Sequence, residues 1–202
     1  MAGPTYRATV GSQVVDLPIV QLDDDLAIAL LISVDLGVAF CERAAAELVA
    51  RIGDLGVELV VSVATMGIPV ALEVTRRLGL DQYVILHKTP KIHLTDAVAE
   101  PVRSITTAVD QRLLLDRRRI PAVAGRRVAL IDDVVSTGAS AAAALRLLRG
   151  VGAQIVVIGT LVTEASIWRS SLGDDAKMVR ALGSIPVFRP DGSGGLVEDW
   201  AG

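Results

Sequence analysis

Aromatic residues and cysteine are both scarce in this chain of 202 residues. Phe, Trp and Tyr supply only 3% of a sequence that is 51% hydrophobic, so the core must consist mainly of aliphatic side chains. The single cysteine, Cys41, excludes an intramolecular disulfide and indicates a reducing, cytoplasmic location, where a lone thiol in a helix is inert core. The formal net charge of -3 gives no electrostatic reason to expect binding to nucleic acid or to an anionic membrane.

The chain also lacks a long uninterrupted hydrophobic segment. Its most apolar stretch, residues 26–40, is interrupted by Asp35 and follows the acidic run 23–25, whereas a signal peptide would begin with basic residues and end at a cleavage site. We therefore interpret this stretch as a buried or interface helix and expect no membrane association. The sequence shows no internal repeat, low-complexity tract or linker, and its length suits one domain spanning residues 1–202.

What the sequence does contain is an alternation of strand-length aliphatic runs and Ala-rich helical stretches. This pattern predicts an α/β fold with a mostly parallel central sheet flanked by helices. Two alternating segments, residues 102–107 and 111–115, predict a hairpin or an extended flap. Helices are expected at residues 39–52 and 69–78, and strands at residues 58–63, 83–86, 154–163 and 185–188, the last of which is expected to be the final strand.

One stretch, residues 128–140, combines a strand, two adjacent acids and a turn of small residues. Four apolar residues that suit a buried strand lead to Asp132 and Asp133, and an Ala/Leu-rich helix follows the turn. A helix N-terminus presents unpaired amide groups and the positive end of a dipole, so such a turn can surround a phosphate group. The turn consists of Ser136, Thr137, Gly138, Ala139 and Ser140, and the glycine would let the backbone approach a ligand closely.

The two acids need partners of their own. Asp132 and Asp133 follow the strand at its carboxyl end, where they cannot both be buried as bare charges. Ribose hydroxyls or a hydrated magnesium ion would satisfy them. The stretch therefore predicts a phosphate-binding turn with a sugar or metal site beside it.

Residues 128–140 resemble the phosphoribosyl pyrophosphate signature of the type I phosphoribosyltransferases, which has apolar residues, two acids, two apolar residues and a Thr-Gly turn. The resemblance covers residues 40–188 and implies the α/β fold of that family, with a small variable hood and a flexible flap loop. It implies that Asp132 and Asp133 contact the ribose 2- and 3-hydroxyls and that the turn 136–140 holds the 5-phosphate. The hood would come from residues 17–21 and 187–189, where Phe188 could either stack on a base or make an apolar contact.

The resemblance also implies a binding site for pyrophosphate. Backbone amides of the loop after the first core strand would bind it, and this loop consists of Ala64, Thr65, Met66 and Gly67. Magnesium would be held chiefly by the substrate, with Asp132 and Asp133 as potential protein ligands.

A mobile loop, residues 87–110, is expected over the active site. Its cations would neutralise the negative charge that develops on departing pyrophosphate. Lys88, to which we assign a catalytic role, and Lys91 are the first candidates, with His87 and Arg103 behind them. The basic run 117–119 precedes a loop on the far side of the sheet, so we interpret it as a solvated face.

The reaction that the resemblance implies is attack of a nitrogenous base on the anomeric carbon, giving a nucleoside monophosphate and pyrophosphate. Ser136 stands where hypoxanthine-guanine enzymes carry an Asp that serves the purine N7, and a serine takes that acid-base role poorly. The sequence most resembles adenine phosphoribosyltransferases, with similarity to xanthine enzymes, so a purine-type base is the expected acceptor. It departs from the adenine enzymes in reading Ala-Thr-Met-Gly at residues 64–67 instead of Glu-Ser-Arg-Gly, and in placing Thr106 where they carry a flap glutamate.

Two alternatives to a synthetic transferase remain open at this point. The missing Glu and Arg would suit a regulator that binds phosphoribosyl pyrophosphate as an effector, although residues 1–40 contain no DNA-binding segment with a basic recognition face. An enzyme that cleaves a nucleotide in the reverse or hydrolytic direction could use the same site. For either enzyme we expect a cytoplasmic, magnesium-dependent homodimer whose partners are phosphoribosyl pyrophosphate and a nucleobase.

Overall fold

The computed structural model describes residues 3–92, 94, 96–102 and 111–202. At its centre lies a sheet of five parallel strands in the order β10-β9-β8-β4-β5. The α/β class and the parallel sheet predicted from the sequence are confirmed. The aliphatic runs of the sequence suit such a sheet because helices bury both of its faces. The strands are β4 (Leu59–Val63), β5 (Tyr83–Leu86), β8 (Arg127–Val135), β9 (Gln154–Glu164) and β10 (Val179–Ile185).

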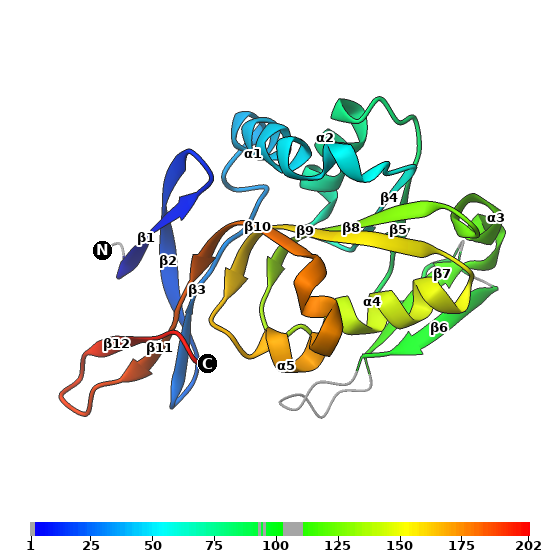
Figure 1. Ribbon diagram of the computed structural model, residues 1–202. Helices are drawn as coiled ribbons and strands as arrows, with labels where there is room; N and C mark the ends of the chain where they lie inside the picture. The colour runs from blue at the N-terminus through cyan, green and yellow to red at the C-terminus, as the bar shows by residue number, and fades with distance from the viewer. Residues whose placement is uncertain (1–2, 93, 95, 103–110) are drawn as a thin grey trace.

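Helices cover both faces of this sheet (Figure 1). On one face lie α1 (Val38–Ile52) and α2 (Ile68–Arg77), and on the other lie α4 (Ala139–Gly150) and α5 (Trp168–Leu172). Successive strand residues alternate between the two layers, since Val60 belongs to the core cluster under α1 and α2 and Val61 to the cluster under α4. The sheet therefore separates two aliphatic cores.

A second five-stranded sheet, which we call the hood sheet, is antiparallel and has the order β1-β2-β3-β11-β12. It lies beside the β10 edge of the central sheet (Figure 1), where the Gly11 amide donates a hydrogen bond to the Leu182 carbonyl at 3.1 Å. Both ends of the chain build it, as the resemblance implied for the hood. Its strands are β1 (Thr5–Val10), β2 (Gln13–Asp23), β3 (Leu26–Ala29), β11 (Val187–Pro190) and β12 (Leu196–Asp199).

A small antiparallel hairpin packs beside α4 and β5. The Arg146 guanidinium of α4 contacts Glu100 of the hairpin at 2.6 Å, and the His87 amide donates to the Leu114 carbonyl at 3.0 Å. The hairpin consists of β6 (Ala97–Pro101) and β7 (Arg112–Asp116). The remaining short elements are α3 (Ile120–Val123) and the 3-10 helices Gly53–Leu55, Arg117–Arg119 and Gly173–Met178.

Two predicted elements need correction. Residues 26–40 do not form one helix, because they contain β3 and then a connection that ends where α1 begins at Val38. The segment 185–188 is not the final strand, because Pro186 separates β10 from β11, which belong to different sheets, and β12 follows. The second predicted segment of the hairpin, residues 111–115, overlaps β7, which pairs with β6, whereas residues 103–107 of the first predicted segment lie outside the described residues.

Two further expectations concern the core and the membrane. Cys41 is buried in α1, and burial raises the pKa of its thiol. Within the described ranges, no helix is long and apolar enough to cross a membrane.

Candidate functional site

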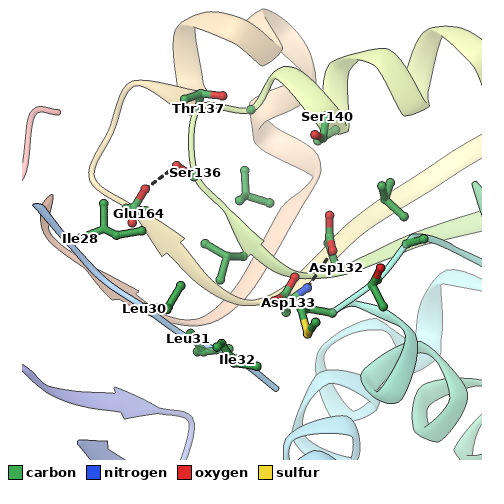
Figure 2. Close-up of a pocket in the computed structure, with 18 of the residues that line it drawn as sticks. Ile28, Leu30, Leu31, Ile32, Asp132, Asp133, Ser136, Thr137, Ser140 and Glu164 are labelled. Atoms are coloured by element: carbon green, nitrogen blue, oxygen red, sulfur yellow. Dashed lines mark hydrogen bonds between the residues drawn. The ribbon is translucent and has the colours of Figure 1, made fainter. Parts of the chain in front are cut away.

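A cavity of about 510 Å³ opens at the carboxyl edge of the central sheet, where ligand sites of parallel α/β sheets are found (Figure 2). The hood sheet closes one side of it and the turn before α4 closes another. Its wall consists of residues 28–32, residues 63–66, Lys88, residues 132–138, Ser140, Ala141 and Glu164.

Two adjacent carboxyl groups lie on the floor of the cavity, at the end of β8. The Asp133 amide donates a hydrogen bond to Asp132 Oδ1 at 3.0 Å, and Thr160 Oγ1 of β9 donates to the Asp133 carbonyl at 2.9 Å. Burial raises the pKa of Asp132 well above its ordinary value and the Asp133 charge raises it further, while the Lys88 ammonium opposes both effects. Burial also raises the pKa of Asp133. Hydroxyl donors or a cation would therefore stabilise the ionised form of the two carboxyl groups.

The turn after β8 has the geometry of an anion site. Gly138 adopts φ 79°, which favours glycine, and α4 begins at the next residue. The Ala139 amide donates weakly to Thr137 Oγ1 at 3.4 Å, whereas the amides of Thr137 and Gly138 donate no hydrogen bond within the described part of the chain. Free amides at the start of a twelve-residue helix offer several donors to one phosphate group.

A second strand-to-helix loop faces the first. It joins β4 to α2, contains a cis peptide bond between Ala64 and Thr65, and receives a hydrogen bond from Ser33 Oγ to the Met66 carbonyl at 2.5 Å. Gly67 lies directly behind Asp132, because a Cβ atom on this glycine would stand 2.5 Å from Asp132 Oδ1. The loop is therefore fastened both to the segment after β3 and to the carboxylate pair.

The cavity wall brings together most of the residues predicted for the site. Four of the residues predicted to contact phosphate groups do not line it: Gly67 supports Asp132 from behind, Ala139 is buried in α4, Lys91 is exposed outside the wall, and His87, directly after β5, is not part of the wall. Lys88 follows β5 and lies close enough to lower the pKa of both aspartates. Arg103 lies outside the described residues.

The basic run before α3 stays away from the cavity, as predicted. Arg117 pairs with Asp96 at 2.9 Å and Arg118 with Asp116 at 2.7 Å. Arg119 donates to the Tyr83 carbonyl at the amino end of β5, the end of the strand opposite the cavity.

Sequence reasoning missed one acidic residue of the wall. Glu164 ends β9 next to β8, is 6% exposed, and accepts a hydrogen bond from the Ser136 hydroxyl. Burial raises the pKa of its carboxyl group, and the hydrogen bond from Ser136 opposes this. An acid at the carboxyl end of a predicted strand was the available signal, but it becomes informative only once β9 is known to lie beside β8.

The hood residues that face the cavity also differ from those predicted. Residues 17–21 and 187–189 do not line it, and Phe188 is buried with its ring edge-on to Tyr6 at a centroid distance of 5.6 Å. Instead, residues 28–32 line the wall.

A parallel sheet with two strand-to-helix loops and a carboxylate pair around a cavity at its carboxyl edge defines the class of doubly wound α/β proteins. Within that class the chain belongs to the phosphoribosyl transferase domain family, whose model matches residues 36–188. The fold is that of the type I phosphoribosyltransferases, as the signature implied.

The individual relatives are named for different bases. An orotate phosphoribosyltransferase of Desulforamulus reducens is 26% identical over 75% of this chain and 67% of its own length. A xanthine phosphoribosyltransferase of Laribacter hongkongensis is 26% identical over 76% of this chain and 77% of its own. An adenine phosphoribosyltransferase structure from Rhodothermus marinus matches with a TM-score of 0.59 and 21% identity, over 71% of this chain and 78% of that one. The chain spans only 50% and 66% of the length of two further orotate relatives.

Proposed function

We propose that this protein transfers the phosphoribosyl group of phosphoribosyl pyrophosphate to a purine-type, adenine-like base, giving a nucleoside monophosphate and pyrophosphate. The observation that carries the proposal is the convergence on one cavity of the Asp132–Asp133 pair and two strand-to-helix loops. Each loop begins a helix of ten residues or more, so each offers a separate anion site. A substrate with phosphate groups at both ends of a ribose matches this arrangement.

The proposed role of each element follows from its chemistry. The turn 136–140 would hold the 5-phosphate, and residues 64–67 would hold the pyrophosphate through their amides. Asp132 and Asp133 would accept hydrogen bonds from the ribose 2- and 3-hydroxyls and fix the sugar between the two anion sites. Lys88, whose charge already acts on both aspartates, would reach the pyrophosphate as it leaves.

The chemical step is a substitution at the anomeric carbon. The base nitrogen forms a bond to this carbon while the bond to the pyrophosphate oxygen breaks, the electron pair leaves with pyrophosphate, and the base loses a proton. Positive charge develops on the sugar, where the adjacent carboxylates of Asp132 and Asp133 would stabilise it.

The same carboxylates fit Mg²⁺, which prefers oxygen ligands and, when bound, would neutralise charge on the pyrophosphate. Among the described residues no cluster of three acidic, His or Cys side chains could hold a metal alone, so the substrate would supply most ligands.

The test is a panel of free bases, with magnesium and phosphoribosyl pyrophosphate, in which nucleotide and pyrophosphate are both quantified. The panel contains adenine, hypoxanthine, guanine, xanthine, orotate and uracil. We expect a nucleoside monophosphate and pyrophosphate in equal amounts from a purine. Isothermal titration of phosphoribosyl pyrophosphate is measured in parallel, because binding without turnover of any base would favour the effector function over a transferase.

The carboxylate pair provides the corresponding mutational test. We expect Asp132→Asn with Asp133→Asn to lower kcat/KM by at least about 100-fold, because hydrogen bonds from the ribose to charged acceptors are lost at two positions. Asp54→Asn, an exposed aspartate in the 3-10 helix Gly53–Leu55, is the matched control and should retain full activity. Full activity in the double variant would contradict the assigned ribose site.

A further inference from the structure

Glu164 forms a part of the cavity wall that the proposed roles leave unused. Its carboxyl group is 6% exposed at the end of β9, and it contacts the turn before α4 through Ser136, the first residue of that turn. Among the residues that the structure describes, Ser136 alone donates a hydrogen bond to it and no cation pairs with it. A buried carboxylate with one donor is poorly compensated, so a ligand that brings a further donor would bind favourably here.

The phosphate groups of the substrate are not that ligand, because a carboxylate repels them. Figure 2 shows Thr137 and Ser140 at the end of the cavity where α4 begins, whereas Glu164 lies beside Ser136 on the side of the hood sheet. The phosphate groups are assigned to the amides of the two loops and the ribose to the aspartate pair, so the acceptor base is the remaining part of the reaction that can lie against Glu164.

The wall around Glu164 suits a flat heteroaromatic ring. Residues 28–32 all line the cavity, and among them Ile28, Leu30 and Ile32 are the partly exposed ones, alternating with the buried Ala29 and Leu31. Aliphatic side chains of this kind pack on a ring face but carry no hydrogen-bonding information. Glu164 and Ser136, the polar groups on this side, would then form hydrogen bonds with the groups on the edge of the ring.

We propose that Glu164, oriented by the Ser136 hydroxyl, selects the acceptor by accepting a hydrogen bond from an amino group, so that the site prefers amino-substituted heteroaromatic bases. This inference rests on the transferase function proposed above. An ionised carboxylate only accepts hydrogen bonds, so it attracts an amino group and repels the carbonyl oxygen of a keto base at the same position. A site built around such a contact rejects the analogue that lacks it, because its polar group is then left unpaired.

The experiment compares adenine with hypoxanthine, which carry an amino group and a keto oxygen, respectively, at C6 of the same ring system. We expect wild-type kcat/KM to favour adenine by at least about 100-fold. Glu164→Gln should lower kcat/KM for adenine by about 10- to 100-fold and narrow the preference, because a neutral amide binds the amino group less strongly and can also donate to a carbonyl. Its affinity for phosphoribosyl pyrophosphate should fall much less than kcat/KM for adenine, because Glu164 contacts the 5-phosphate turn only through the Ser136 hydroxyl and an amide oxygen can still accept that hydrogen bond.

Three controls separate the outcomes. Glu198→Gln makes the same change on β12 outside the cavity and should leave both bases unaffected. Ser136→Ala should lower the adenine preference less than Glu164→Gln, since it releases the carboxylate without removing it. Glu164→Asp, which keeps the charge but withdraws it by one methylene, covers the case in which the glutamine variant does not fold, and it should also lower turnover of adenine.

A wild-type enzyme that turns over hypoxanthine, xanthine or orotate in preference to adenine would overturn the role of Glu164 and leave the transferase function intact. An unchanged ratio of adenine to hypoxanthine in Glu164→Gln would do the same. No binding of phosphoribosyl pyrophosphate, or binding without turnover of any base, would instead overturn the transferase function and this inference with it.

Discussion

At the scale of single residues, Asp132 shows how a group that serves binding can lower the stability of the protein without its ligand. Its pKa is raised in the folded state, so protonation favours folding. The contribution of the neutral carboxyl group is fully present below the unfolded pKa, about 3.9, and is lost as the pH rises through the higher folded pKa. At neutral pH the buried charge therefore destabilises the fold.

We accordingly expect Asp132→Asn to raise the Tm of the ligand-free protein at pH 7 by about 2–4 °C, the change that 1 kcal/mol produces in a domain of this size. The amide keeps an oxygen that can accept the Asp133 amide hydrogen bond. The difference should vanish below about pH 4, where the wild-type carboxyl group is also neutral. Thermal unfolding of both proteins from pH 3.5 to 8 measures it. A variant that is less stable than the wild type at pH 7 would show that the carboxylate is compensated within the protein.

At the scale of elements, the strand-turn-helix unit from β8 to α4 could be predicted from the sequence because all its determinants are local. The aliphatic strand, the two acids, Gly138 and the Ala-rich helix follow one another within a single stretch. The segment around β3 could not be predicted in this way. Its residues lie alternately in the core and in the apolar wall of the cavity, so residues on both faces, such as Ala27 and Ile28, are hydrophobic. The alternation of polar and apolar residues that usually indicates a strand is therefore absent.

Glu164 also shows where prediction from local sequence ends. Its strand is predicted, but its place in the site depends on β9 pairing with β8, which no local pattern encodes. The hood was predicted at both ends of the chain, yet the residues that reach the cavity come from β3 and the segment after it. Long-range strand order, and not local propensity, decides these positions.

The loop from β4 to α2 allows a test of close packing at the element scale. Gly67 has φ -70°, which any residue can adopt, so a Gly67→Ala variant meets only a steric obstacle. Its Cβ would stand 2.5 Å from Asp132 Oδ1 and 2.6 Å from Ser62 Oγ. We expect a loss of stability of about 1–3 kcal/mol from overpacking. We also expect a fall in kcat/KM of about 10- to 100-fold, because displacement of a positioned group by 1 Å can cost that much.

Gly53→Ala provides the matched control for this variant. Its backbone is also helical and its Cβ would meet only Val49 at 3.9 Å, so stability and kinetics should both stay close to wild type. Chemical denaturation and steady-state kinetics measure the two effects. Full activity in Gly67→Ala would show that catalysis does not depend on the position that Asp132 has in this structure.

At the scale of the whole molecule, the cavity lies where two separately built sheets meet. The central sheet supplies the groups assigned to phosphoribosyl pyrophosphate, and residues 28–32 supply the apolar wall assigned to the base. The sheets approach closely at β1 and β10, where a Cβ on Gly183 would stand 2.1 Å from the Thr9 carbonyl oxygen. A larger residue at Gly183 therefore requires the backbone of β1 or β10 to move, which would change the position of the hood sheet relative to the central sheet.

We therefore expect Gly183→Ala to displace β1 and lower stability by about 1–3 kcal/mol, the usual cost of overpacking. Because the displacement starts in the hood sheet, KM for the base should rise more than the dissociation constant of phosphoribosyl pyrophosphate. Gly150→Ala, at the end of α4 with open space around its Cβ, should leave both quantities unchanged. Kinetics with varied base at saturating phosphoribosyl pyrophosphate give KM for the base, and titration calorimetry gives the dissociation constant of phosphoribosyl pyrophosphate. Equal weakening of both ligands would mean that the two sheets respond as one unit, and that recognition of the base cannot be altered through the hood sheet alone.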